Sequence, residues 1–500
     1  MERLTKQMRK RYDAMFEKKK DEIVFARDSL VIHGQNYYVS NGGDDENDGL
    51  SPSTPWKSLE KVSSAHLLPG DGVLFRRGDL FRGSVYTKSG VTYGAYGSGP
   101  KPKFYGCEIS LADPALWEEA DPVHHIWKCK EKMLDAGTIV FNDGQAHSRK
   151  LIPSYKHGIF VCRDDESRAF VMAEEMTRDL DLFWEFDEVL TTVPSKGEDF
   201  PIPDMESKDA LGDIYLRCDK GNPGEVYTSV EALSRVHMFR VGSNENVRID
   251  NLCIKYVGMH GISAYDQVNG LHVSNCEIGW IGGCIQHYLG TDPNYPQGGR
   301  GTVTRFGNAI EIYGGCRDYV AENNYIYQVY DAGITHQITT SVKISMKGIR
   351  YTGNVIENCV YGIEYFLEQI HGESESCMED VLMNENYIRL SGYGWGQQRH
   401  NVDTPALIKG WSYRNTARDY HIYDNVFDRS AYRMLHLVAW KDEYCPKMHD
   451  NVYIQTLGGM LGQYGGNEFA EPENLLYNEN AERMIAEVFM DKGAKVYFEN

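Results

Sequence analysis

The chain has 500 residues, 41% of them hydrophobic, which is enough for a sizeable core, and its formal net charge is −20. A negative field of this size repels nucleic acids and polyanionic substrates, so we expect neither as a partner. No apolar run is long enough to span a membrane, and the first residues lack the apolar core of a signal peptide. We therefore expect no membrane partner and a cytoplasmic location.

The 11 cysteines are scattered through the chain without a CxxC motif or a paired spacing. Their odd number, and the position of several in expected strands, favour reduced thiols in a core. Disulfides persist in oxidising compartments, so this pattern also favours the cytoplasm. The sequence contains no metal-ligand spacing of His and Cys and no nucleotide-binding fingerprint, so we expect no cofactor.

Residues 1–30 form a strongly charged segment in which apolar side chains recur at helical intervals, at Leu4, Met8, Tyr12, Met15 and Phe16. We expect a helix that packs on the body of the protein or covers the first coil of a solenoid, because the terminal strands of a solenoid are open edges. A helix that binds a partner or a membrane surface is the alternative.

Residues 36–106 combine a strand, an Asn/Asp/Gly turn, a short helix and a second strand. The helix is expected to start at Ser53-Thr54-Pro55, because Ser or Thr can cap it and proline fits the first turn. The acidic turn from Asp44 to Gly49 half-matches a calcium loop, but Pro55 takes the place of the twelfth-position carboxylate. We therefore expect a plain turn there and no metal site.

This opening resembles the first coils of right-handed parallel β-helix carbohydrate-active proteins, the pectate-lyase-like glycoside hydrolases and polysaccharide lyases. The resemblance implies an all-β solenoid, which we expect over residues 31–470. Residues 107–235 break the rhythm, and their alternating apolar runs predict a β-rich elaboration inserted between early coils, with a small separate β domain as the alternative. Residues 471–500, with a helix pattern near 480–491 and a final strand, are expected to cap the C-terminal end.

An Asn-x-apolar triplet repeats through the second half of the chain, beginning at Asn324, Asn354, Asn386, Asn425 and Asn451. A second apolar strand follows about ten residues after these triplets and after two degenerate earlier copies, at Ile262, Ile285, Ile334, Ile363, Trp395 and Leu435. Such spacing predicts stacked coils, in which Asn tolerates left-handed turns and its amides form a ladder. An antiparallel β domain with Asn-rich turns is the alternative.

Three stretches between the repeats are longer than the coils require: 287–306, 370–380 and 397–418. Loops on one face of a solenoid usually wall its binding site, and we expect these to do so. Ile285 and Ile310 are assigned to one coil that the first of these loops splits.

Side chains alternate along a strand, so the residue after each core isoleucine should point outward. This column is expected to hold Ser263, Glu311, Thr335, Glu364 and then the region of Gly396, with Asp331 at the entry turn of one strand. At a strand spacing of ~4.8 Å, Glu311 and Asp331 lie on adjacent coils and Glu311 and Glu364 roughly 9.6 Å apart. Carboxylates about 5–5.5 Å apart suit retaining glycosidases and about 6.5–9.5 Å inverting ones. A solvated surface Glu and a turn-forming Asp are the simpler alternatives.

The strings Gly-Asn-Ala-Ile-Glu-Ile and Tyr-Asp-Ala-Gly-Ile-Thr-His-Gln resemble β-helix glycosidase-like sequences. The resemblance implies a glycoside hydrolase acting on a neutral or lightly charged oligosaccharide, with Glu311, Asp331 and Glu364 as catalytic candidates and no metal. Residues that could bind the sugar are His260, His287, Tyr313, His336, Gln337, Tyr365, Tyr393 and Trp395.

Two other functions remain open at this point. A polysaccharide lyase of this fold needs a Lys or Arg base, and basic residues on the expected coil face are sparse: Lys343, Lys347, Arg350 and Arg389. A non-catalytic glycan-binding β-helix would not depend on the carboxylates. The sequence leaves the oligomeric state open.

Overall fold

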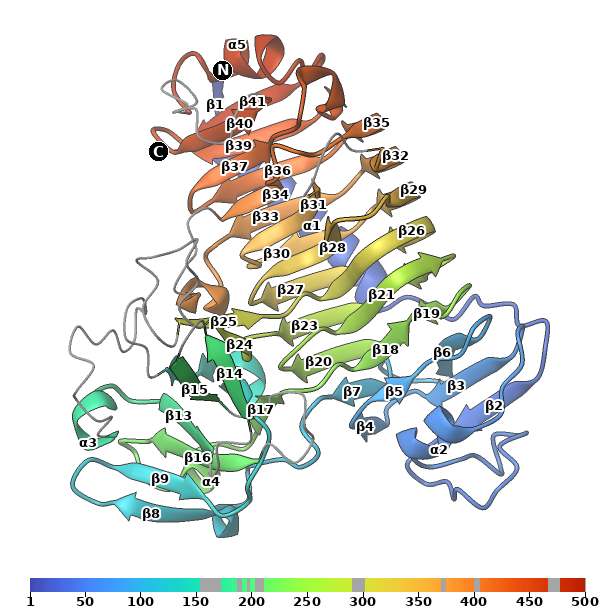
Figure 1. Cartoon of the computed structure of the whole chain (residues 1–500), viewed down its shortest axis with the longest axis vertical. Coiled ribbons are helices and arrows are strands. Elements are labelled where there is room, and N and C mark those ends of the chain that lie inside the picture. Colours follow the sequence, from blue (N-terminus) through green and yellow to red (C-terminus); the bar gives the residue numbers. More distant parts are fainter. Residues whose placement is uncertain are drawn as a thin grey trace.

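The computed structural model describes residues 1–152, 172–186, 191–195, 198–202, 211–289, 302–369, 375–399, 405–465 and 477–499. Within these ranges the strands stack in parallel into three columns that run along the molecule (Figure 1). A typical coil contributes one strand to each column, and the long β26 contributes to two of them. The right-handed parallel β-helix class predicted from the sequence is confirmed.

The first stack consists of β4 (Leu80–Arg82), β7 (Lys103–Tyr105), β20 (Cys253–Val257), β23 (Glu277–Ile281), β27 (Tyr325–Val329), β30 (Val355–Glu357), β33 (Tyr387–Ser391), β36 (Val426–Ser430), β39 (Val452–Thr456), β41 (Lys495–Glu499) and β1 (Glu2–Arg3). Because β1 pairs in parallel with β41, the two ends of the chain meet at the same end of the solenoid (Figure 1).

The second stack consists of β5 (Val85–Tyr86), β18 (Phe239–Gly242), β21 (Ile262–Asn269), β26 (Ile310–Glu322), β28 (Ala332–Thr340), β31 (Tyr361–Gln369), β34 (Ala406–Gly410), β37 (Arg433–Leu437) and β40 (Met460–Tyr464). The third stack consists of β2 (Asn36–Val39), β3 (Gly72–Arg76), β6 (Thr92–Tyr96), β19 (Arg248–Asp250), β22 (His272–Ser274), the end of β26, β29 (Ser345–Thr352), β32 (Cys377–Asn384), β35 (Ala417–Tyr423) and β38 (Lys447–His449).

A ladder of buried aliphatic side chains fills the solenoid behind the second stack: Ile262, Ile310, Ile334, Ile363, Ile408 and Leu435. The predicted ladder was wrong at two places. The sequence assigned both Ile285 and Ile310 to one step of the ladder, but only Ile310 belongs to it. Ile285 lies in the hairpin of β24 (Cys284–Leu289) and β25 (Thr302–Phe306). Ile408 stands where Trp395 was assigned, because Trp395 belongs to the 3-10 helix Trp395–Gln398.

The predicted asparagine ladder is confirmed. The Asn324 backbone N–H donates to Oδ1 of Asn354 at 3.0 Å, and the same bond joins Asn354 to Asn386 and Asn386 to Asn425 at 3.0 Å and Asn425 to Asn451 at 2.9 Å. The left-handed residue of each turn is the one before the ladder asparagine, for example Glu385 with φ 56° and Asp424 with φ 55°. The ladder asparagines are therefore selected for their amides and not for their backbone angles.

The insertion between early coils lies beside one end of the solenoid (Figure 1). Its strands β8 (Trp117–Asp121), β9 (Ile126–Cys129), β12 (Arg149–Leu151), β13 (Asp181–Phe186) and β16 (Gly212–Arg217) form one sheet. Its other elements are β10 (Ala136–Phe141), β11 (Ala146–His147), β14 (Thr191–Ser195), β15 (Glu198–Ile202), β17 (Val230–Ser234), α3 (Met172–Glu175) and α4 (Pro223–Val226). Since β17 pairs with both β10 and β20, this strand joins the insertion to the first stack.

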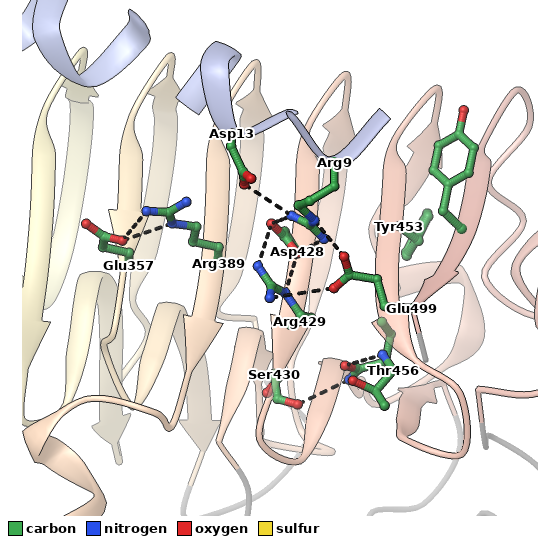
Figure 2. Close-up of polar contacts among 12 residues, drawn as sticks. Arg9, Asp13, Glu357, Arg389, Asp428, Arg429, Ser430, Tyr453, Thr456 and Glu499 are labelled. Atoms are coloured by element: carbon green, nitrogen blue, oxygen red, sulfur yellow. Dashed lines mark hydrogen bonds and ion pairs between the residues drawn. The ribbon is translucent and has the colours of Figure 1, made fainter. Parts of the chain in front are cut away.

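Helix α1 (Lys6–Val24) lies along the outer face of the first stack. Thr5 caps it, and Phe16 is buried against Tyr387, Val355 and Val426. Figure 2 shows the polar contacts beside this apolar strip: Arg9 donates to both oxygens of Asp428 and to Glu499 at 2.7 Å. The helix thus covers the flank of the coils from β27 to β39.

Helix α2 (Leu59–Ser64) begins four residues later than the sequence suggested, because Ser58 is its cap and accepts from the N–H of Lys61. The residues from Asp44 to Pro55 form a turn in which Asp48 accepts from Leu50 N and from Thr54. At the C-terminal end, α5 (Ala481–Glu487) packs into the solenoid core. None of the helices in the described ranges is both long and apolar enough to cross a membrane.

Candidate active site

The outward column of the second stack carries the predicted carboxylates. In register order it holds Ser263, Glu311, Thr335, Glu364, Lys409 and His436. Glu311 lies on β26 and Glu364 on β31, so two ladder steps, roughly 9.6 Å, separate their backbones. The column continues to Lys409 and not to Gly396, because β34 and not the 3-10 helix supplies the next strand.

Glu311 is buried in a set of nitrogen donors. Its Oε2 lies 2.6 Å from Nδ1 of His260 and accepts from Asn308 Nδ2 at 2.8 Å, and its Oε1 faces Gln337 Nε2 at 3.4 Å. Burial raises the pKa of Glu311, but His260, Asn308 and Gln337 outweigh burial and hold the pKa below its ordinary value. Glu311 is therefore ionised at neutral pH.

His260 Nδ1 also lies 2.9 Å from the backbone N–H of Asn308. A ring nitrogen either carries a proton or accepts one. When Nδ1 carries no proton, it accepts the hydrogen bond from the Asn308 backbone N–H. When Nδ1 is protonated, it donates to Glu311 instead. His260 Nδ1 thus lies between the Asn308 backbone and the Glu311 carboxylate.

Glu364 has the opposite environment. Burial is the largest influence and raises its pKa to about 7, and the charges of Asp331 and Glu311 add to this, whereas Lys409 and Arg399 lower it. Lys409 Nζ lies 3.7 Å from Oε1 of Glu364 and 4.0 Å from the centre of the Tyr361 ring. A carboxyl with this pKa carries a proton in part of the molecules near neutrality, as a general acid requires.

Asp331 lies at the entry turn of β28 and forms an ion pair with Arg399. Burial by itself lowers the pKa of Arg399, but Asp331 and the neighbouring phenols outweigh burial and raise the pKa above its ordinary value. The guanidinium therefore stays charged. One coil further on, Arg433 Nη1 contacts His436 Nδ1. Burial, then Arg433 and Lys409, lower the pKa of His436 to about 3, so this imidazole is neutral.

Of the eight predicted sugar-binding residues, two contact Glu311, two are partly exposed, three are buried and one has no described side chain. His260 and Gln337 contact Glu311, and Tyr313 is 37% exposed in the next outward column of the same stack, beside Tyr265 and in register with Gln337. Tyr393 is 51% exposed on the turn after β33. The side chain of His287 lies outside the described residues.

The other three side chains are buried, which corrects the expectation that they contact substrate. His336 and Tyr365 stack ring on ring inside the solenoid, because they follow the outward residue and alternation turns them inward. His336 Nδ1 lies 2.9 Å from the hydroxyl of Tyr351, and burial lowers the pKa of His336 to about 3. Trp395 packs against Trp280 and Tyr330.

The sequence reasoning missed Asn308, Arg399, Lys409 and His237. His237 stacks on His260 at 5.0 Å and its Nε2 lies 3.0 Å from the Tyr265 hydroxyl. Lys409 could have been predicted, because it directly follows an isoleucine of the apolar ladder. Arg399 could not, because it lies outside the repeat. Across the described ranges no three His, Cys, Asp or Glu residues gather in a way that could hold a metal ion.

Fold and site together define a parallel β-helix protein with two carboxyl groups of unlike environment on one outward column. No family model matches the chain. A segment of 51 residues is 51% identical to a lacto-N-biosidase of Bifidobacterium longum subsp. longum, and this match covers 10% of the present chain and 3% of that protein. The chain thus matches a small part of its curated relative.

Solved structures of similar architecture have low sequence identity to the chain. A GH136 lacto-N-biosidase from Eubacterium ramulus is 12% identical with a TM-score of 0.34, over 99% of this chain and 70% of that one. A rhamnogalacturonan lyase is 10% identical with a TM-score of 0.39, over 85% and 75% of the two chains. A family 28 exopolygalacturonase from Yersinia enterocolitica is 12% identical with a TM-score of 0.28, over 93% and 78%.

Proposed function

We propose that the protein is a glycoside hydrolase in which Glu364 is the general acid and Glu311 the general base. The observation that carries this proposal is that the surroundings shift the pKa values of two carboxyl groups of one column in opposite directions. The pKa of Glu364 is raised to about 7 by burial, and the pKa of Glu311 is lowered by its hydrogen-bond donors despite burial. Glycoside hydrolysis needs one protonated and one ionised carboxyl group.

The spacing of the pair favours inversion at the anomeric carbon. Two ladder steps separate Glu311 and Glu364 by roughly 9.6 Å, near the upper end of the ~6.5–9.5 Å that inverting enzymes use to admit a water. Asp331 is the third candidate, and a Glu311–Asp331 pair on adjacent coils would favour retention. Its ion pair with Arg399 is better suited to orienting groups than to donating a proton.

The substrate we propose is an oligosaccharide. The 51-residue match to a lacto-N-biosidase supports a carbohydrate substrate, and the exposed ring of Tyr313 beside Gln337 offers a surface on which a sugar can stack. The hydroxyls and amides around Glu311 would bind sugar hydroxyl groups.

The test is to replace Glu311 with Gln, Glu364 with Gln and Asp331 with Asn and to measure release of the aglycone from a panel of aryl glycosides. We expect Glu311→Gln and Glu364→Gln each to lower turnover by about 10²–10⁴-fold, because acid–base assistance supplies that factor. Glu379→Gln, on β32 and 38% exposed at its side chain, is the control and should keep full activity. Folded Glu311 and Glu364 variants with near-normal turnover would refute the assignment.

The cations beside Glu364 give a polysaccharide lyase more support than the sequence did. A lyase needs a basic side chain that can accept a proton. Burial lowers the pKa of Lys409, but Tyr361 and Glu364 raise it above its ordinary value, so Lys409 stays protonated and is a poor base. The two activities are separated by their products, since only a lyase releases an unsaturated sugar that absorbs ultraviolet light.

A further inference from the structure

Three cationic side chains lie on the C-terminal side of Glu364. The charges of Lys409 and Arg399 act on Glu364 itself, and Arg433 contacts His436, which follows Lys409 in the column. Arg399 follows the 3-10 helix, Lys409 lies on β34 and Arg433 on β37. The described carboxylates that pair with them are Asp331, which binds Arg399, and Glu364, which lies 3.7 Å from Lys409. If Glu364 holds the proton of a general acid, three cations face one carboxylate. His436 does not alter this balance, because it is neutral.

The surplus positive charge lies in a protected place. The side chains of Lys409 and Arg399 are 16% and 17% exposed, and Lys409 faces the ring of Tyr361 on one side. The Nε atoms of Arg399 and of Arg433 are buried, and within the described ranges neither has a hydrogen-bond acceptor. Buried charges and buried donors normally have partners, because leaving them without one is costly. Among the described residues, the cluster therefore lacks an anion.

We propose that this cluster of Arg399, Lys409 and Arg433 is a subsite for one anionic group, a carboxylate or a sulfate ester, on the sugar that lies on the Lys409 side of the cleaved bond. The inference rests on the proposed function. Lys409 is one ladder step, ~4.8 Å, from Glu364, so the anion belongs to a sugar next to the reacting centre. Away from Lys409, Tyr313 on the strand of Glu311 and Tyr265 on the preceding coil present partly exposed rings suited to an uncharged sugar.

A single anionic group is compatible with the net charge of −20. The field of the whole protein is screened over about 10 Å at ordinary ionic strength and repels a chain of many charges. One carboxylate or sulfate that reaches the cluster is held by direct charge-assisted hydrogen bonds instead. The substrate class we propose is therefore an oligosaccharide with one acidic sugar, and a chain of many charges is disfavoured.

The first experiment measures anion binding without catalysis. The melting temperature is compared in sodium sulfate and in sodium chloride of equal ionic strength at low millimolar concentration, for the wild type, Lys409→Met and the control Lys343→Met. Lys343 is 67% exposed at its side chain and pairs with Glu375. We expect sulfate to raise the melting temperature of the wild type and of Lys343→Met and not that of Lys409→Met.

Arg433→Gln is the second variant, in case Lys409→Met does not fold, and it should weaken the effect in the same direction. Sodium glucuronate and glucose are then compared as a second pair of ligands, which separates carboxylate recognition from sulfate recognition. An equal rise in the wild type and in both subsite variants, or no rise in any of them, would overturn the proposal.

The second experiment compares oligosaccharides that differ in one group, a neutral sugar against the same sugar with a 6-carboxylate or a 6-sulfate. We expect the wild type to prefer an acidic member by about tenfold or more in kcat/KM, since hydrogen bonds to charged groups are strong, and Lys409→Met to lose this preference mainly through KM. Hydrolysis that needs Glu311 and Glu364 but shows no preference would refute the subsite alone. Anion binding without hydrolysis would refute the hydrolase alone.

Discussion

At the scale of single residues, Glu311 and Glu364 occupy one column and differ only in their neighbours. Glu311 is surrounded by donors, so its charge is stabilised, while Glu364 is buried beside other acids, so its charge is disfavoured. Lys409 is the main group that opposes this shift at Glu364. The acid and base roles therefore follow from which side chains the adjacent coils supply.

These environments predict the pH dependence of turnover. A general acid works only while protonated, so kcat should fall as the pH rises through about 7, the pKa of Glu364. The base must be ionised, so the acid limb should lie below the ordinary range of a glutamate. Because Lys409 lowers the pKa of Glu364, Lys409→Met should move the alkaline limb upward. The measurement is kcat against pH for both proteins, and an alkaline limb that stays in place would contradict the assignment.

At the scale of elements, the asparagine ladder ties each coil to the next. Asn386 accepts from the N–H and Nδ2 of Asn354 and donates to the carbonyl of Tyr351 and to Asn425. All of these partners are buried, so each bond that is lost leaves a group unsatisfied.

We therefore expect Asn386→Ala to lower the free energy of unfolding by about 3 kcal/mol or more, since each unsatisfied buried group costs about 1–3 kcal/mol. Asn323→Gly is the matched control. Asn323 is exposed with φ 52°, an angle that glycine adopts freely. Urea unfolding followed by circular dichroism measures both, and equal stability of the two variants would show that the ladder contributes little.

Helix α1 gives a second prediction at this scale, through the buried carboxylate of Asp428 shown in Figure 2. Arg9→Met removes two charge-assisted hydrogen bonds from Asp428, which keeps its ion pair with Arg429. We expect the free energy of unfolding to fall by about 1.5–3 kcal/mol, and Lys10→Met, at an exposed position, to lower it by much less. Burial raises the pKa of Asp428, but Arg9 and Arg429 lower it below the ordinary value.

The sign of the pH effect follows from this shift. A depressed carboxyl pKa stabilises the fold above the unfolded pKa and loses this contribution as the pH falls through the folded pKa. The difference between wild type and Arg9→Met should therefore be full near neutrality and shrink in acid. Thermal unfolding measured across that range tests it, and a difference that grows in acid would contradict it.

At the scale of the whole molecule, the cysteines are dispersed through the core. The ten described cysteines have no disulfide partner, and all but Cys377 are buried. Burial raises the pKa of Cys276 and of Cys316 to about 12, so these thiols do not form the reactive thiolate in the native state.

We predict that thiol titration of the unfolded, unreduced protein counts close to all 11 cysteines and that the native protein reacts at few of them. The same titration after reduction is the control. A count that rises by several thiols on reduction would reveal disulfides and would contradict the prediction of a reducing compartment.

The sequence by itself determined the coil repeat, the asparagine ladder and the outward position of Glu311 and Glu364. These features follow from strict local rules, because strands alternate with a period of two and stacked coils repeat the same turn. The same rule applied one residue further would have placed His336 and Tyr365 inside.

Only the tertiary structure decided which residues complete the site. Arg399 reaches Asp331 across 68 positions, and Arg9 reaches Asp428 across 419. Insertions of unequal length separate the coils, so sequence spacing does not report which strand follows Glu364, and the fold brings Lys409 there and not Gly396. The cations that distinguish this site are thus a property of coil stacking, which the repeat alone does not encode.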